Sequence, residues 1–71
     1  MVQHRLQRGF EQRGVTRVDE VFWVISGRLE VFFPQGEYHG VAAGCSIVVP
    51  AWQTYNIRAT EPCVVATAYL G

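Results

Sequence analysis

The sequence predicts a single small all-β domain, residues 1–71, built as an antiparallel barrel. It has 71 residues, enough for one domain. Its apolar segments are rich in β-branched and aromatic residues and too short for convincing helices. Turn signals recur at roughly 8–12-residue spacing, as in antiparallel sandwiches and barrels. These signals are Ser26-Gly27, Pro34-Gln35-Gly36, Ala43-Gly44, Pro50-Ala51 and Thr60-Glu61-Pro62.

The segments between the turns predict six strands, at about 20–26, 28–33, 37–42, 46–49, 54–59 and 63–69. Ser26-Gly27 separates two apolar runs, which predicts a tight hairpin with a positive φ at the glycine. Residues 21–25 and 47–49 are apolar at every position, so both faces of these strands are expected to be covered. Residues 55–59 alternate, which predicts one solvated face.

The first 14 residues allow several interpretations. Val2, His4 and Leu6 alternate with polar residues, which favours an edge strand, open to exchange with a partner subunit, or a poorly ordered arm. A helix at residues 3–12 is the alternative, weakened by Gly9 and by a poor apolar stripe.

Composition points to self-association. Hydrophobic residues make up 49% of the chain and charged residues 17%, which is more apolar surface than a short chain can easily hide. A twofold homodimer is the commonest way to cover such an excess. The formal net charge is zero, so neither nucleic acid nor an anionic membrane is an expected partner.

Two cysteines, Cys45 and Cys63, are too few for a disulfide framework and lack metal-finger spacing. Both lie in apolar runs and are expected to pack as small hydrophobes. A single disulfide is the alternative if their strands are neighbours. The N-terminal segment has no apolar core typical of a signal peptide, and no stretch reaches a membrane-spanning length. A cytoplasmic protein with reduced thiols is therefore expected.

Two motifs carry a family resemblance. A glutamate, six residues and a glycine span 20–27, on a predicted strand and its hairpin turn. A glycine, five residues and a proline then span 44–50. With this order and spacing the chain resembles the cupin family over about residues 13–70. The resemblance implies a jelly-roll β-barrel.

The chain departs from the family at the positions that hold a metal. The resemblance implies two histidines before Glu20 and a third after Pro50. Before Glu20, the two positions are occupied by Arg13 and Val15, or by Gly14 and Thr16 if the shorter family spacing applies. After Pro50, the position of the third histidine is occupied by Tyr55. The glycine expected two residues after Pro50 is Trp52, and His4 and His39 lie outside both motifs. One carboxylate cannot replace three imidazoles, so neither a bound metal nor another cofactor is expected.

Without the histidines, the side chains that remain in the barrel are compatible with three functions. The first is non-catalytic binding of a small organic ligand inside the barrel. The second is a metal-independent isomerase, epimerase or lyase that uses Glu20 and Tyr55 as acid and base. The third is a structural dimerisation domain whose barrel is filled by Phe22, Val24, Leu29 and Val48. The candidate ligand-binding residues are Glu20, Trp52, Tyr55, Phe22 and Arg13.

Glu20 itself has two interpretations. It either points into an apolar cavity beside Tyr55 and Trp52, or serves as a strand-start carboxylate. In the second case it would be hydrogen-bonded to backbone or paired with Arg13, Arg17 or Arg58. A cavity lined by Glu20 and Tyr55 would favour the first two functions.

Overall fold

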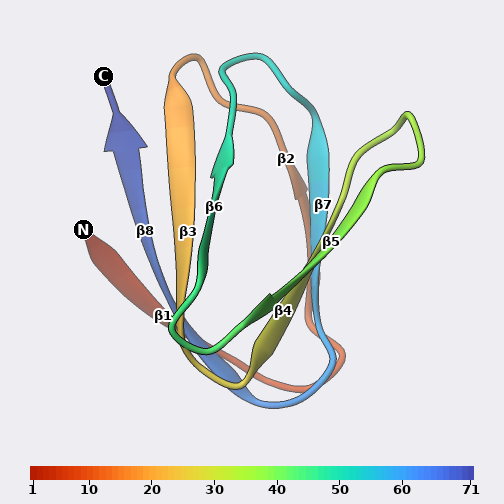
Figure 1. The fold of residues 1–71 in the computed structure, drawn as a ribbon, viewed down its shortest axis with the longest axis vertical. Helices are drawn as coiled ribbons and strands as arrows, with labels where there is room; N and C mark the ends of the chain where they lie inside the picture. The colour runs from red at the N-terminus through yellow and green to blue at the C-terminus, as the bar shows by residue number, and fades with distance from the viewer.

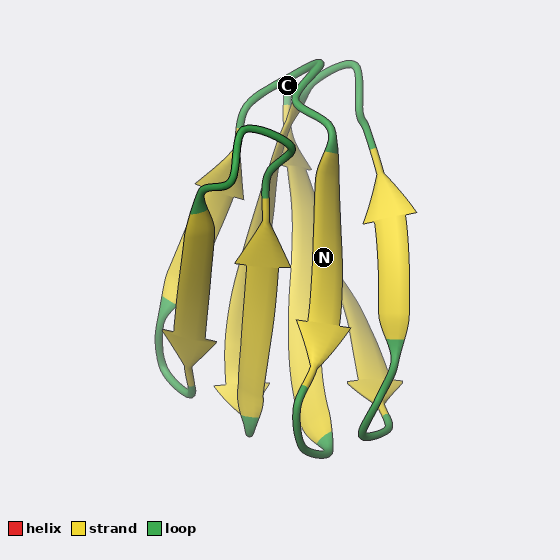
Figure 2. Ribbon diagram, turned by 90° about the vertical axis from the view of Figure 1, so that its right-hand side faces the viewer, coloured by secondary structure: helices red, strands yellow, loops and turns green.

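The computed structural model describes all residues 1–71 and contains eight strands in two four-stranded antiparallel sheets (Figures 1 and 2). The strands are β1 (Val2–Leu6), β2 (Glu11–Gly14), β3 (Asp19–Ser26), β4 (Arg28–Phe32), β5 (Tyr38–Ala42), β6 (Ser46–Val49), β7 (Tyr55–Ala59) and β8 (Cys63–Leu70). The first sheet has the order β1-β8-β3-β6 and the second β2-β7-β4-β5. The predicted all-β antiparallel fold is confirmed.

The six strands predicted from residue 20 onward all form, with boundaries shifted by no more than one residue. The N-terminal segment forms two further strands, each at the edge of a different sheet. The alternative helix at 3–12 is wrong, because the chain turns at Gly9, whose φ is 88°, between the two strands. β1 pairs with β8 of the same chain.

Alternate residues of the strands point into the interior between the sheets. On β3, Glu20, Phe22 and Val24 face inward, and Glu20 is the only buried charged residue of the chain. The core cluster consists of Phe22, Val24, Leu29, Val31, Phe33, Val41, Val49, Tyr55, Ile57, Ala59, Cys63 and Val65. Val48, expected in the core, is 50% exposed, because its neighbour Val49 takes the inward position of β6.

The expectation that β3 and β6 are covered on both faces is not met within one chain. Trp23, Ile25 and Val48 are about half exposed on the outer side of the first sheet. No other part of the chain packs over this side, since both sheets close on a single interior.

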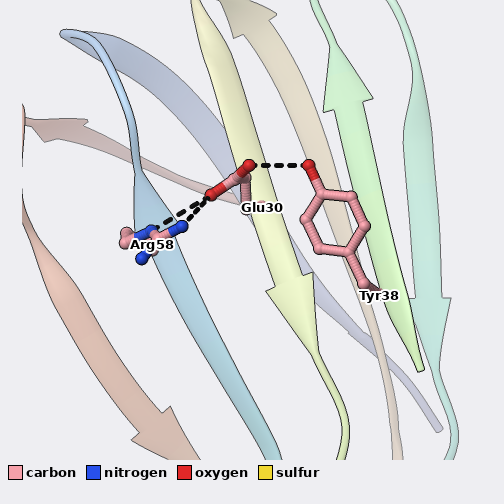
Figure 3. Close-up of polar contacts among 3 residues, drawn as sticks. All are labelled: Glu30, Tyr38 and Arg58. Atoms are coloured by element: carbon pink, nitrogen blue, oxygen red, sulfur yellow. Dashed lines mark hydrogen bonds and ion pairs between the residues drawn. The ribbon is translucent and has the colours of Figure 1, made fainter. Parts of the chain in front are cut away.

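The outer side of the second sheet is polar and internally bonded (Figure 3). Arg58 donates to Glu30 Oε1 from Nε and Nη2, at 3.0 and 2.7 Å, and Tyr38 Oη donates to Glu30 Oε2 at 2.6 Å. The hydrogen bond from Tyr38 and then that from Arg58 lower the pKa of Glu30. Arg58 thus pairs with Glu30 and not with Glu20.

The predicted hairpin turn at Ser26-Gly27 forms with a φ of 79° at Gly27. A Cβ at this position would lie 2.4 Å from the carbonyl oxygen of Pro62, so the turn requires glycine for space as well as for conformation. Both cysteines are free thiols. Cys63 is buried, but Cys45 is exposed because it lies in the turn before β6. The structure contains no helix long and apolar enough to cross a membrane.

Candidate ligand-binding cavity

A cavity of about 610 Å³ lies between the two sheets, lined by residues of β1, β2, β3, β7 and β8 and by Phe10. Phe10, Phe22, Ile57 and Val65 are among its apolar lining residues. Its volume falls in the range typical of small-molecule sites, about 300–1,000 Å³. Its wall includes β1, an edge strand of the first sheet, and β2, an edge strand of the second.

Glu20 and Tyr55 meet inside this cavity from opposite sheets. Glu20 faces inward near the start of β3 because it shares the side of Phe22, and it is only 5% exposed. Tyr55, at the start of β7, donates a hydrogen bond from Oη to Glu20 Oε1 at 3.0 Å. The rings of Phe22 and Tyr55 pack edge to face with centroids 5.3 Å apart. The phenol is thereby held over the carboxylate.

The carboxylate of Glu20 has no other partner in the protein. No arginine, lysine or histidine forms an ion pair with it, and Oε2 accepts no hydrogen bond. Every fully buried polar side-chain atom of the chain has a hydrogen-bond partner. Because Oε2 of Glu20 has none, it is not fully buried, and it is open to the cavity that Glu20 lines. Of the two interpretations of Glu20, the inward one fits its position, with Tyr55 as its partner.

The proton of Tyr55 is firmly held. Burial raises the pKa of Tyr55, and the hydrogen bond to Glu20 and its negative charge raise that pKa further. Tyr55 is therefore a neutral phenol at any physiological pH, and its hydrogen is directed at Glu20. The arrangement leaves Glu20 Oε2 free to accept a hydrogen bond inside the cavity.

No protein-family model and no curated protein matches the sequence. Solved structures do match. A cupin superfamily protein from Desulfitobacterium hafniense superposes with a TM-score of 0.89 at 13% identity, over 96% of this chain and 62% of the other. The chain has a cupin-like fold.

Two further solved structures also match. A cupin-2 domain protein from Shewanella frigidimarina has a TM-score of 0.81 at 24% identity, over 92% of this chain and 63% of its own. A protein of unknown function from Rhizobium leguminosarum has a TM-score of 0.82 at 29% identity, over 92% of this chain and 62% of its own. The chain thus spans about three fifths of the length of these structures.

The residues of this cupin-like barrel do not fit a transition metal. Gly14 faces inward as the register partner of Tyr55, whereas its neighbour Arg13 faces the other side. A Cβ at Gly14 would lie 2.7 Å from Tyr55 Oη and 2.8 Å from Cζ, so the phenol fills the space that a ligand side chain at residue 14 would need. No group of three or more histidine, cysteine, aspartate or glutamate side chains could hold a metal ion.

The structure brings together only part of the predicted site. Glu20, Tyr55 and Phe22 line the cavity, but Trp52 and Arg13 do not. Trp52 is 69% exposed in the loop between β6 and β7, with a φ of 64° and its backbone N–H donating to Thr16 O. Arg13 lines a separate cavity of about 380 Å³ with Phe32, among others.

Sequence reasoning missed the polar wall of the cavity. Polar and charged side chains line it from β1, β2 and β8: Gln3, His4, Arg5, Gln12, Thr67 and Tyr69. His4 Nε2 and Thr67 Oγ1 lie 3.4 Å apart. The alternation of Val2, His4 and Leu6 was the available signal, because a strand that packs Leu6 against the core also points His4 inward.

Proposed function

We propose that this chain binds a small organic molecule in the cavity between its sheets and catalyses no reaction there. The observation that carries the proposal is Glu20, a carboxylate 5% exposed with one oxygen facing a cavity of about 610 Å³. A buried carboxylate without a cationic partner is unfavourable unless its hydrogen-bonding capacity is met. A ligand that donates to Oε2 would meet it.

The ligand group that fits this end of the cavity is a hydrogen-bond donor, and a protonated amine fits best. An ammonium group would neutralise the carboxylate of Glu20. The rings of Phe22, Tyr55 and Phe10 line the same cavity, and aromatic faces attract cations. The side chains of His4, Thr67 and Tyr69 would meet polar groups farther along the ligand.

The metal-independent isomerase, epimerase or lyase has less support. Such an enzyme would need Tyr55 to deliver a proton to the substrate, but its hydroxyl donates to Glu20 and its pKa is raised. Tyr55 thus suits a positioning role for the carboxylate. The filled-barrel hypothesis has less support because the interior contains a sizeable cavity.

A thermal-shift panel of primary amines, polyols and carboxylic acids tests this proposal. Binding to the folded chain raises its stability by about 2.7 kcal/mol when the ligand is at 100 times its Kd, which for a chain of this size raises Tm by roughly 10 °C or more. We expect amines to give the largest shift with the wild-type chain. The shift should be lost in Glu20→Gln, which keeps the shape of the side chain and removes its charge.

Glu61→Gln is the matched control, because Glu61 is exposed and outside the cavity. It should retain the full wild-type shift. The proposal is contradicted if no compound stabilises the chain, or if Glu20→Gln responds as the wild type does.

A further inference from the structure

A second cavity, of about 380 Å³, lies at one end of the second sheet and shares only Tyr55 with the cavity that contains Glu20. Arg13 on β2 and Asn56 on β7 are register partners, and Asn56 is also the partner of Phe32 on β4. Partners in an antiparallel sheet project to the same side, with their Cβ atoms about 4.5–5.5 Å apart. Three neighbouring strands therefore contribute one row of side chains to this cavity.

We call this space the Arg13 cavity. It is lined by Arg13, Phe32, Phe33, Pro34, Thr54, Tyr55 and Asn56. Arg13 forms no ion pair, and the side chains of Thr54 and Asn56 form no hydrogen bond within the chain. A guanidinium fork, a hydroxyl and an amide N–H can together supply four donors, the number that the two oxygens of a carboxylate can accept.

The acidic side chains on the same side of the second sheet leave the charge of Arg13 uncompensated. Glu30 is bonded to Arg58 and Tyr38 (Figure 3). Glu11, two residues before Arg13 on β2, lies opposite Arg58 in the register. No glutamate or aspartate lines the Arg13 cavity itself. An anion entering this cavity would therefore meet a free cation and no carboxylate that competes for it.

The rest of the Arg13 cavity is apolar. Phe33 is buried and Phe32 is half buried, and Pro34 follows them in the loop after β4. Pockets of about 300–1,000 Å³ with an apolar lining and a few converging polar groups are typical of small-molecule sites, and this cavity lies near the lower limit. A ligand with one anionic end and a small apolar body fits both parts.

We propose that the Arg13 cavity binds the carboxylate of a small organic acid, whose apolar part packs on Phe32, Phe33 and Pro34. One arginine compensates one negative charge, which favours a carboxylate over a doubly charged phosphate. The site is distinct from the amine-binding cavity proposed above, and the two ligands have opposite charge. Each site can therefore be tested without the other.

Titration of the ¹⁵N-labelled chain with benzoate, followed by two-dimensional NMR, tests the site. The amide signals of residues 13, 32–33, 54 and 56 should shift and saturate, and those of His4 and Thr67 in the other cavity should not. Benzamide keeps the ring but has no charge, and inorganic phosphate has no apolar part. Both should bind at least about tenfold more weakly than benzoate, because the site needs the charge-assisted bond and the apolar contact together.

Arg13→Gln should weaken benzoate binding at least about tenfold, because it removes the charged fork. Arg17→Gln is the matched control, since Arg17 is exposed, makes the same change of charge and lies outside the cavity. It should bind as the wild type does, and so should Glu20→Gln, whose substitution lies in the other cavity. Asn56→Asp provides a second disruption that keeps the side-chain shape and places a negative charge beside Arg13.

The proposal is overturned if benzoate shifts no signal at the Arg13 cavity up to millimolar concentration. Benzamide or phosphate binding as tightly as benzoate would also overturn it, because the ligand would then not be recognised as an organic carboxylate. Equal losses of affinity in Arg13→Gln and Arg17→Gln would reduce the effect to net charge and reject the site.

Discussion

Glu20 and Tyr55 form a hydrogen bond that spans the interior of the molecule, from β3 in one sheet to β7 in the other. The phenol hydrogen meets one carboxylate oxygen, while Phe22 packs against the ring. This contact has a double role: it orients the carboxylate and it ties the two sheets together. The position opposite Tyr55 is a glycine, Gly14, because the ring needs that space.

Replacing Tyr55 by Phe should destabilise the fold measurably. The change leaves Glu20 Oε1 buried without its donor, and an unpaired buried acceptor costs about 1–3 kcal/mol of unfolding free energy. Urea denaturation of Tyr55→Phe and the wild type gives this difference.

Tyr38→Phe is the control, since Tyr38 also donates to a glutamate, but on the solvated side of the second sheet. It should lose less than about 1 kcal/mol, because Glu30 keeps its bonds from Arg58 and water can replace the phenol. Equal losses in both variants would show that the Glu20 contact has no special weight.

At the scale of the element, three neighbouring strands of the second sheet are joined by one side-chain network. Glu30 on β4 receives bonds from Tyr38 on β5 and Arg58 on β7 (Figure 3). Arg58 also lies 5.2 Å from the centroid of the Phe32 ring. Cross-strand pairs of this kind stabilise a sheet and help to fix its register.

This network predicts a pH dependence with a definite sign. The pKa of folded Glu30 lies below its ordinary value of 4.5, so its carboxylate stabilises the fold above that value. The stabilisation is lost as the pH falls through the lowered pKa of the folded state. The unfolding free energy of the wild type should therefore exceed that of Glu30→Gln at neutral pH, and the two should converge in acid. A gap that stays constant from pH 7 to pH 2 would contradict this.

The sequence was informative for most of the elements. The strands from residue 20 onward could be predicted from their β-branched residues and from the glycine and proline turns between them. The first motif, residues 20–27, covers most of β3, and the second, residues 44–50, contains β6. β1 and β2 were harder, because both are short, largely exposed strands at sheet edges. Only pairing with β8 and β7, over 50 residues away in places, makes them strands.

At the scale of the whole molecule, the cavity depends on contacts that are remote in sequence. Glu20 and Tyr55 could be predicted as neighbours from the resemblance to cupins. The sequence could not exclude Trp52 and Arg13 from the cavity lining. The direction of the Trp52 side chain depends on a loop with a positive φ at that residue, and the direction of Arg13 depends on the register of β2. His4 and Thr67 meet only because β1 lies beside β8.

The most direct test of the ligand-binding account is a crystal structure of the chain with the amine that gives the largest thermal shift. The predicted result is density in the cavity of about 610 Å³, with the amine nitrogen about 2.7–3.2 Å from Glu20 Oε2 and the hydrogen bond from Tyr55 intact. A ligand bound elsewhere, such as in the cavity beside Arg13, or bound with its amine turned away from Glu20, would contradict the account.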